Sequence, residues 1–340
     1  MSHDPVLVTG ATGFVGRHLL QQLSKDDAFR PVALVRDKKT WVDYEWTKSL
    51  KKVELIEGSV TDPKDWSRKS ALKGLKGIFH LAAIIRHSRD NPQDMIETNV
   101  EGLLAMVRLG AELKCRVVFV STSGTVGCFP SEKEWADEES PYAEKVVGSW
   151  PYYQSKIQAE KKARALAKKL GVELVILRPP VLLGPGDHRL RATGHILRLM
   201  RGKLPFIVNG GMHFVDIRDA SRAMIKAMTV AKPRPIYHLT GTVLGIDEFF
   251  KMAAEIAGVP APKLQLPAYL ARILAKASHQ IESLLPKRSH PLLPDPVVFE
   301  MASKHWNIKS RYAQELGYQS RDPEKTLTDT IAWLRENQKI

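Results

Sequence analysis

The chain has only two cysteines, Cys115 and Cys128, in 340 residues. Two are too few for a disulfide framework, and their spacing matches no metal-ligand motif, so we expect no metal site. The sequence also lacks an apolar run of about 18 residues and the apolar segment of a signal peptide. It therefore predicts neither a membrane-spanning helix nor secretion, and the cytoplasm is the expected location.

The balance of charge is basic, with 51 Lys and Arg against 37 Asp and Glu and a net charge of +14. No nucleic-acid recognition motif is present, and aromatic residues do not alternate with the basic ones, so we expect no nucleic-acid partner. The excess is typical of a solubilising surface, with anionic cofactors and anionic membranes as alternatives. Hydrophobic content of 44% allows a sizeable core.

A glycine-rich stretch lies close to the N-terminus, at residues 6–16 (VLVTGATGFVG). Three β-forming residues precede glycines spaced three apart, and apolar residues then recur at helical spacing, which predicts strand, tight turn and helix. Gly10 permits the turn, Gly13 lets the backbone approach a pyrophosphate, and Gly16 lets the helix pack on the strand. The helix N-terminus offers N–H groups to the anion, so we expect a dinucleotide at this turn.

With Thr9 in front, this pattern resembles the extended short-chain dehydrogenase/reductase family, in which Thr-Gly-Ala-Thr-Gly-Phe-Val-Gly is typical. The resemblance implies a Rossmann-type, doubly wound parallel α/β sheet. The NAD(P)-binding domain would span residues 1–186, with some later segments returning to it, and a smaller substrate-binding lobe would span 187–340. The cofactor contacts that it implies at the turn are Thr9, Gly10, Thr12, Gly13, Phe14, Val15 and Gly16.

Three further segments are expected to contact the cofactor. The second predicted strand, 31–36, ends in Arg36, and an arginine at this place accommodates a 2′-phosphate, which favours NADP. Asp37 leaves NAD open, because an acid there would hold the ribose 2′-hydroxyl. The resemblance places Ser59 and Val60, after the predicted strand 53–58, near the adenine. Small residues end the run 77–83, so Leu81, Ala82 and Ala83 are expected beside the cofactor, with His80 as a satisfied core histidine.

The catalytic group is expected at the start of a long helix from Pro151 to Leu170. Tyr152 and Lys156 are four residues apart and share one face. A lysine ammonium near the phenol favours the phenolate, so Lys156 is expected to lower the pKa of Tyr152 and to hold the nicotinamide ribose. A hydroxyl after the strand 116–120 would polarise the substrate carbonyl. If residues are counted from the end of this strand as in dihydroflavonol reductases, the hydroxyl belongs to Thr122. If they are counted as in nucleotide-sugar epimerases, it belongs to Ser123.

Other site residues follow from the resemblance. Asn99, in a helix expected to open at residue 97, matches an asparagine that braces the backbone beneath the active site; a surface or capping asparagine is the alternative. Residues 178–185 match the family's Arg-Pro-x-x-x-x-Gly-Pro segment, which makes Pro179 and Val181 neighbours of the nicotinamide carboxamide.

Residues in the C-terminal half help to distinguish between branches of the family. Met212 stands where epimerases carry a pyrophosphate-binding arginine, and residues 302–307 lack their Arg-Pro-Gly-Asp motif. Residues 124–126, 150–156 and 315–318 resemble the dihydroflavonol-reductase-like and 3β-hydroxysteroid-dehydrogenase-like branch. This implies an NADP-preferring oxidoreductase that interconverts a ketone or aldehyde and an alcohol on a fairly hydrophobic small molecule. The alternatives are an epimerase or dehydratase with transient hydride transfer, and an NADP-sensing regulator.

One stretch fits none of these motifs. Large apolar residues from Leu266 to Leu284 recur at helical spacing opposite Arg272 and Lys276. A basic amphipathic helix can lie on a membrane, although such a stripe more often packs on its own core or covers a pocket. The resemblance also implies a homodimer through the helices that start near Asn99 and Pro151.

Overall fold

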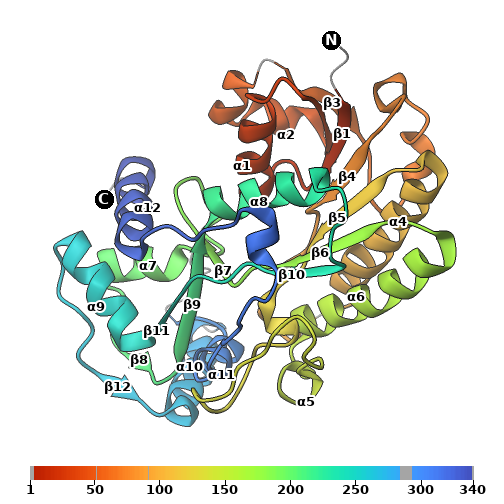
Figure 1. The fold of residues 1–340 in the computed structure, drawn as a ribbon. Coiled ribbons are helices and arrows are strands. Elements are labelled where there is room, and N and C mark those ends of the chain that lie inside the picture. Colours follow the sequence, from red (N-terminus) through yellow and green to blue (C-terminus); the bar gives the residue numbers. More distant parts are fainter. Residues whose placement is uncertain (1–3, 51, 91, 284–292, 339–340) are drawn as a thin grey trace.

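The computed structural model describes residues 4–50, 52–90, 92–283 and 293–338, without the side chains of 279 and 281–283. Its centre is a seven-stranded parallel sheet in the order β10-β6-β5-β4-β1-β2-β3 (Figure 1). The strands are β1 (Asp4–Thr9), β2 (Phe29–Val35), β3 (Glu54–Glu57), β4 (Gly77–His80), β5 (Arg116–Val120), β6 (Leu174–Arg178) and β10 (Ile236–His238). The order confirms the predicted doubly wound sheet.

Helices cover both faces of this sheet, which explains the continuous apolar runs of its strands. Val6 and Val8 of β1 pack against α1 (Phe14–Leu23) and α8 (Ile217–Thr229). Leu7 points to the other face and packs with residues of α4 (Gly102–Leu113). Next to α4 on that face lies α6 (Pro151–Leu170), whose bounds confirm the predicted helix.

A second lobe forms around a three-stranded sheet, β11-β9-β7, made of β7 (Val181–Leu183), β9 (Gly211–Asp216) and β11 (Thr242–Gly245). Its core lies between this sheet and the helices α7 (Gly194–Met200), α9 (Ile246–Ala257) and α12 (Pro323–Gln338). The chain returns to the large sheet within this half, since α8 packs on α1 and β10 pairs with β6. The remaining elements are α2 (Lys38–Val42), α3 (Gln93–Ile96), α5 (Glu144–Val147), β8 (Ile207–Val208), β12 (Gln265–Leu266), α10 (Ala268–Ser283) and α11 (Pro296–Ala302).

Several predicted boundaries are wrong by a few residues. β4 ends at His80 rather than running to Ala83, because the following backbone N–H groups bind the Thr9 hydroxyl instead of a neighbouring strand. The helix expected to open at residue 97 begins earlier, at Gln93, with α3 directly after Pro92. Residues 97–101 form a π-helical turn. β2 ends at Val35, one residue before Arg36.

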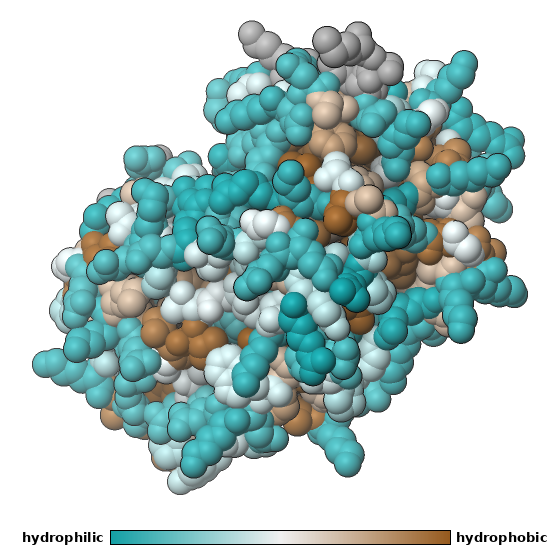
Figure 2. All heavy atoms as spheres, viewed as in Figure 1, coloured by the Kyte–Doolittle hydropathy of each residue, from teal (hydrophilic) through white to brown (hydrophobic). Residues whose placement is uncertain are grey.

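Among the described side chains of α10, Leu270, Ile273 and Leu274 do not pack on the core, contrary to the commoner alternative for this stripe. The small residues Ala271 and Ala275 are buried, whereas Ile273 and Leu274 are exposed; Leu284, the last residue of the stripe, lies outside the described residues. None of the helices described is long and apolar enough to cross a membrane. The face of the molecule drawn in Figure 2 is mostly hydrophilic, with small separate apolar areas.

Candidate active site

The candidate site lies where the strand order reverses, between β1 and β4. In such sheets ligands bind outside the carboxyl ends of the strands at this point. Thr9 ends β1 there, fully buried, and its hydroxyl accepts hydrogen bonds from the backbone N–H groups of Leu81 and Ala82, each at 3.2 Å. It also lies 3.0 Å from Nδ1 of His80. The side chain of Thr9 therefore ties the glycine turn to the segment after β4.

His80 is only partly satisfied, contrary to expectation. Its Nδ1 faces the Thr9 hydroxyl, but Nε2 is buried without a hydrogen-bond partner among the described residues. Burial lowers the pKa of His80 to about 3, so its imidazole is neutral.

The glycine turn fits tightly against its neighbours. Gly10 has a φ of +65°, and a Cβ there would lie 2.7 Å from the backbone nitrogen of Ala82. A Cβ on Gly16 would lie 2.4 Å from the carbonyl oxygen of Gly10. Gly13 occupies the N-cap position of α1, and no side chain caps this helix. The amide groups of Phe14 and Val15 at the first turn are thus available to an anion, and the residues present fit a dinucleotide pyrophosphate.

Arg36 and Asp37, the two candidate ribose ligands after β2, differ in their contacts. The Asp37 carboxylate caps α2, accepting from the Lys39 N–H at 2.8 Å and from the Thr40 hydroxyl at 3.2 Å. Arg36 is exposed directly after the strand. The acid is therefore engaged in helix capping, while the guanidinium extends into solvent.

The predicted adenine residues follow β3. The Ser59 hydroxyl lies 2.8 Å from the Thr61 hydroxyl, and its carbonyl accepts from the Trp66 indole. Val60 packs over Gly102, where a Cβ would lie 2.9 Å from a Val60 methyl group. Asp62 caps the short helix that follows, through the Lys64 N–H.

Helix α6 presents Tyr152 and Lys156 on its first two turns. Pro151 is its first residue, where a missing N–H costs nothing, and Trp150 is the N-cap. Tyr152 is 8% exposed and Lys156 is 3% exposed. The Lys156 ammonium donates to the carbonyl of Val120 at 3.0 Å and lies 4.6 Å from the centre of the Phe119 ring. The lysine thus connects α6 to the end of β5.

Burial controls the titration of both groups. It raises the pKa of Tyr152 above its ordinary value and lowers the pKa of Lys156 to about 8, where the Glu160 carboxylate partly offsets it. The direction for Tyr152 is opposite to the expected lowering by Lys156, because burial removes water from around the phenol and so disfavours the phenolate. Tyr152 therefore keeps its proton at neutral pH and can act as an acid.

Asn99 links the segment after β4 to α6. Its Oδ1 accepts from the Ile84 N–H at 2.8 Å, and its Nδ2 donates to the Ile84 carbonyl at 3.0 Å and to the Ser155 hydroxyl at 2.9 Å. Ser155 donates in turn to the Tyr152 carbonyl at 2.7 Å. Asn99 is 1% exposed, so the surface alternative does not describe it. These bonds connect the backbone at Ile84 to the backbone carbonyl of Tyr152.

The two candidate hydroxyls after β5 have different surroundings. Thr122 is half-buried and accepts from the Gly124 N–H at 3.3 Å, which leaves its own proton free to donate. Ser123 is 2% exposed, and its N–H donates to the Pro179 carbonyl at 2.8 Å. Val181, the other expected carboxamide neighbour, is 37% exposed at the start of β7.

An aromatic wall surrounds Tyr152, and much of it was missed by sequence reasoning. The His87 ring meets the Tyr152 ring edge-on at 5.7 Å, and Trp306 stacks on Tyr153 at 5.2 Å. Val297 of α11 belongs to the same buried cluster. Burial, with help from Arg191, lowers the pKa of His87 to about 4, so its ring is neutral. Trp306 and Val297 lie some 150 residues beyond Tyr152, and no local pattern connects them to it.

The loop after β7 reaches back to the glycine turn. The Arg17 guanidinium on α1 lies 2.5 Å from Nε2 of His188, and Arg189 donates to the Thr12 hydroxyl at 3.5 Å. The Nε of Arg17 is buried without a hydrogen-bond partner among the described residues. Arg17 is not among the predicted site residues, although it directly follows Gly16.

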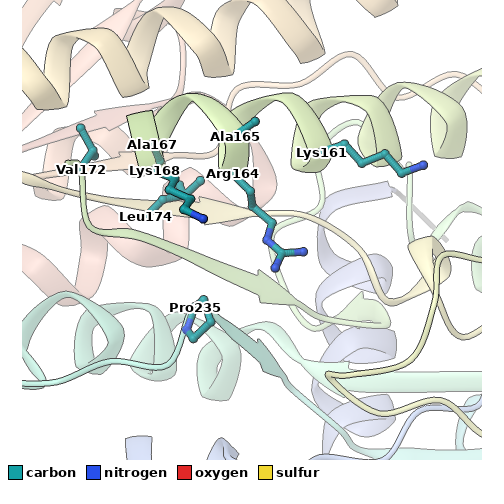
Figure 3. Close-up of a pocket in the computed structure, with 8 residues that line it drawn as sticks. All are labelled: Lys161, Arg164, Ala165, Ala167, Lys168, Val172, Leu174 and Pro235. Carbon is teal, nitrogen blue, oxygen red and sulfur yellow. The ribbon is translucent and has the colours of Figure 1, made fainter. Parts of the chain in front are cut away.

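A hollow of about 540 Å³ lies elsewhere, beside the C-terminal half of α6 (Figure 3). It is lined by Lys161, Arg164, Ala165, Ala167, Lys168, Val172, Leu174 and Pro235. None of these is a predicted site residue, and Tyr152 lies at the other end of the helix. The hollow is therefore separate from the candidate site at the carboxyl ends of β1, β4 and β5.

Comparisons with known proteins agree with this geometry. The model of the NAD dependent epimerase/dehydratase family matches residues 6–240. A putative dihydroflavonol 4-reductase of Synechocystis sp. is 29% identical over 98% of this chain and 95% of its own. Sterol demethylase protein B of Methylococcus capsulatus is 27% identical over 98% and 99%.

Solved structures show the same fold. The structure of gox2253 has a TM-score of 0.81 and 30% identity, covering 99% of this chain and 100% of its own. A UDP-glucose 4-epimerase of Thermotoga maritima, solved with UDP-glucose, has a TM-score of 0.75 and 20% identity, covering 98% and 99%.

Proposed function

Because this chain belongs to the NAD dependent epimerase/dehydratase family, whose members here are NAD(P)-dependent enzymes, we propose that it reduces a ketone or aldehyde on a fairly hydrophobic small molecule with NADPH. The observation that carries the proposal is the pair Tyr152 and Lys156 at the carboxyl edge of the sheet, beside a neutral His87. A bound nicotinamide would supply the hydride to the carbonyl carbon.

The acid of the reaction is Tyr152. Its raised pKa keeps the phenol protonated, so it can give its proton to the carbonyl oxygen as negative charge develops there. The Lys156 ammonium stabilises the tyrosinate that remains, and the tyrosinate takes a proton from solvent before the next turnover. In the reverse direction the tyrosinate takes the alcohol proton. We assign the second hydrogen bond to the substrate oxygen to Thr122, because it is more exposed than Ser123.

The substrate class follows from the wall of the site. Tyr153, Trp306 and Val297 make the surroundings of Tyr152 largely apolar, and neutral His87 adds a polar atom without charge. Relatives named for a dihydroflavonol and for sterol demethylation are in keeping with a ring-bearing, uncharged substrate. Met212 packs in the core of the second lobe, where epimerases carry an arginine, which argues against a nucleotide sugar. Both Tyr152 and Lys156 are present, which argues against a sensor without activity.

The preference for NADP rests on the end of β2. Asp37 caps α2, so Arg36 is the residue free to meet a 2′-phosphate. Fluorescence titration should therefore show tighter binding of NADPH than of NADH, and Arg36→Ala should weaken NADPH about tenfold or more while leaving NADH unchanged. Lys39→Ala, in the neighbouring helix, is the control for a general loss of positive charge.

Equal weakening of both cofactors by Arg36→Ala would contradict the assignment. Tighter NADH binding by the wild type would make Asp37 the ribose ligand. Consumption of NADPH with a panel of aromatic and alicyclic ketones then tests the reaction itself, and its absence with every member would contradict the proposed substrate class.

A further inference from the structure

One face of α10 exposes large apolar side chains. Tyr269, Leu270, Ile273 and Leu274 are 62%, 37%, 58% and 47% exposed, and their spacing places them on one side of the helix. The opposite side carries Ala271 and Ala275, which are fully buried. They pack with Phe206, Val208 and Phe299. From residue 269 to residue 275 the helix thus turns its small residues inward and its large ones to the solvent, which reverses the usual amphipathic arrangement.

The charged residues in the segment before this helix, and in the helix as far as residue 280, are all basic. From residue 261 to residue 280 the sequence has three basic residues and no acidic one. Lys263 and Lys276 are exposed, and Arg272 pairs with Glu300 at 3.1 Å. Leu264, before the helix, is 53% exposed and extends the apolar surface. Apolar side chains flanked by lysines are the pattern of helices that lie in the interface of anionic bilayers.

The same helix is connected to the candidate site. It packs against α11, and Val297 of α11 lies in the cluster of Tyr152 and Tyr153 (Figure 1). Glu300, the partner of Arg272, also accepts from the Trp150 indole at 3.1 Å, at the N-cap of α6. A surface that holds α10 would therefore lie one helix away from the catalytic tyrosine.

We propose that the exposed face of α10, formed by Tyr269, Leu270, Ile273 and Leu274 with Lys263 and Lys276 (the α10 face), docks on the surface of an anionic lipid bilayer. The apolar side chains enter the interface between headgroups and acyl chains, and the lysines meet the lipid phosphates. The net charge of +14 draws the whole molecule toward such a surface. The inference goes beyond the proposed reaction and does not depend on it.

The experiment is co-sedimentation of the full chain with vesicles. One set contains phosphatidylcholine and phosphatidylglycerol in equal parts, and the other contains phosphatidylcholine alone. The wild type should sediment with the anionic vesicles and release at high salt. The variant Ile273→Glu/Leu274→Glu should lower the vesicle partition coefficient at least about tenfold, because two apolar contacts are replaced by charges that the lipid repels. Val42→Glu is the matched control, since Val42 is 66% exposed on α2.

NADPH affinity, measured alongside, verifies that each variant is folded. Wild-type protein that stays in the supernatant with both vesicle types would overturn the proposal, as would a double variant that binds like the wild type. Light scattering tests the other possible occupant of the α10 face, a second copy of this chain. A wild-type oligomer that the same two substitutions dissociate would assign the α10 face to a second copy of the chain, and would also overturn the proposal.

Discussion

A buried ion pair between Glu160 and Arg178 lies next to the candidate site, and we expect its loss to lower the stability of the protein. Glu160 lies one turn after Lys156 on α6, fully buried, and Arg178 ends β6 with 2% exposure. The guanidinium donates to Glu160 Oε2 at 2.5 Å, and the Ser121 hydroxyl donates to Oε1 at 2.5 Å. One carboxylate therefore connects α6 to the ends of β5 and β6.

The perturbation is Glu160→Gln, which keeps the shape and removes the charge. The buried guanidinium would then lose its counter-charge and face an amide whose NH₂ group cannot accept a hydrogen bond. Breaking a buried pair by removing one partner costs about 3–5 kcal/mol, a large part of the total stability of an ordinary domain. Arg178→Met should cost a similar amount, because it leaves the carboxylate alone.

Urea unfolding followed by tryptophan fluorescence measures these losses. In the double variant Glu160→Gln/Arg178→Met no unpaired charge remains, so the loss should be smaller than the sum of the single losses by about 2 kcal/mol or more. Glu144→Gln, on the neighbouring helix α5, is the control, because Glu144 also pairs with a basic residue of α6, Lys161. Its pair with Lys161 is 2.8 Å long but about half exposed on both sides, and its loss should cost less than about 1 kcal/mol.

The reasoning would be refuted if Glu160→Gln cost no more than Glu144→Gln, or if the single losses simply added. A second readout concerns the lysine. The Glu160 carboxylate raises the pKa of Lys156 against the effect of burial, so its removal should shift the alkaline limb of the activity to lower pH.

Two further predictions concern the same region. Asn99→Ala removes hydrogen bonds to the Ile84 N–H, the Ile84 carbonyl and the Ser155 hydroxyl, so it should cost about 2–3 kcal/mol of stability and lower kcat. Asn99→Asp should recover only the bond to the Ile84 N–H. A urea midpoint of Asn99→Ala equal to that of the wild type would show that these bonds do not contribute to stability. The pKa of Lys156 is about 8, so kcat/KM should be constant below this pH and fall above it as the ammonium loses its proton; a profile that rises through that region would mean that the positive charge is not required.

Much of the nucleotide-binding half could be predicted because its signals are local. The glycine spacing, the apolar strands and the Pro151 start of α6 each depend on neighbours within a turn or a strand, and the structure confirms the sheet and the helix. The sequence favours Arg36 over Asp37 as the ribose ligand, but it does not show that the Asp37 carboxylate caps α2.

The remaining surprises come from contacts distant in sequence. Trp306 reaches Tyr153 only because the chain after α11 passes beside the segment that follows β5, where Phe129 pairs with His305. The orientation of α10 was also hidden, since an apolar stripe does not tell which face a neighbouring helix will cover. The small side chains of Ala271 and Ala275 allow close packing, so their face of α10 is the one that is buried.

The most direct test of the central claim is hydride transfer by Tyr152→Phe. The variant loses only the phenol oxygen, so NADPH should bind within about twofold of the wild type, while the rate of carbonyl reduction in a single turnover should fall by about a hundredfold or more. A variant that binds NADPH normally and reduces the carbonyl at the wild-type rate would show that the proton comes from another group, and would contradict the account of the site.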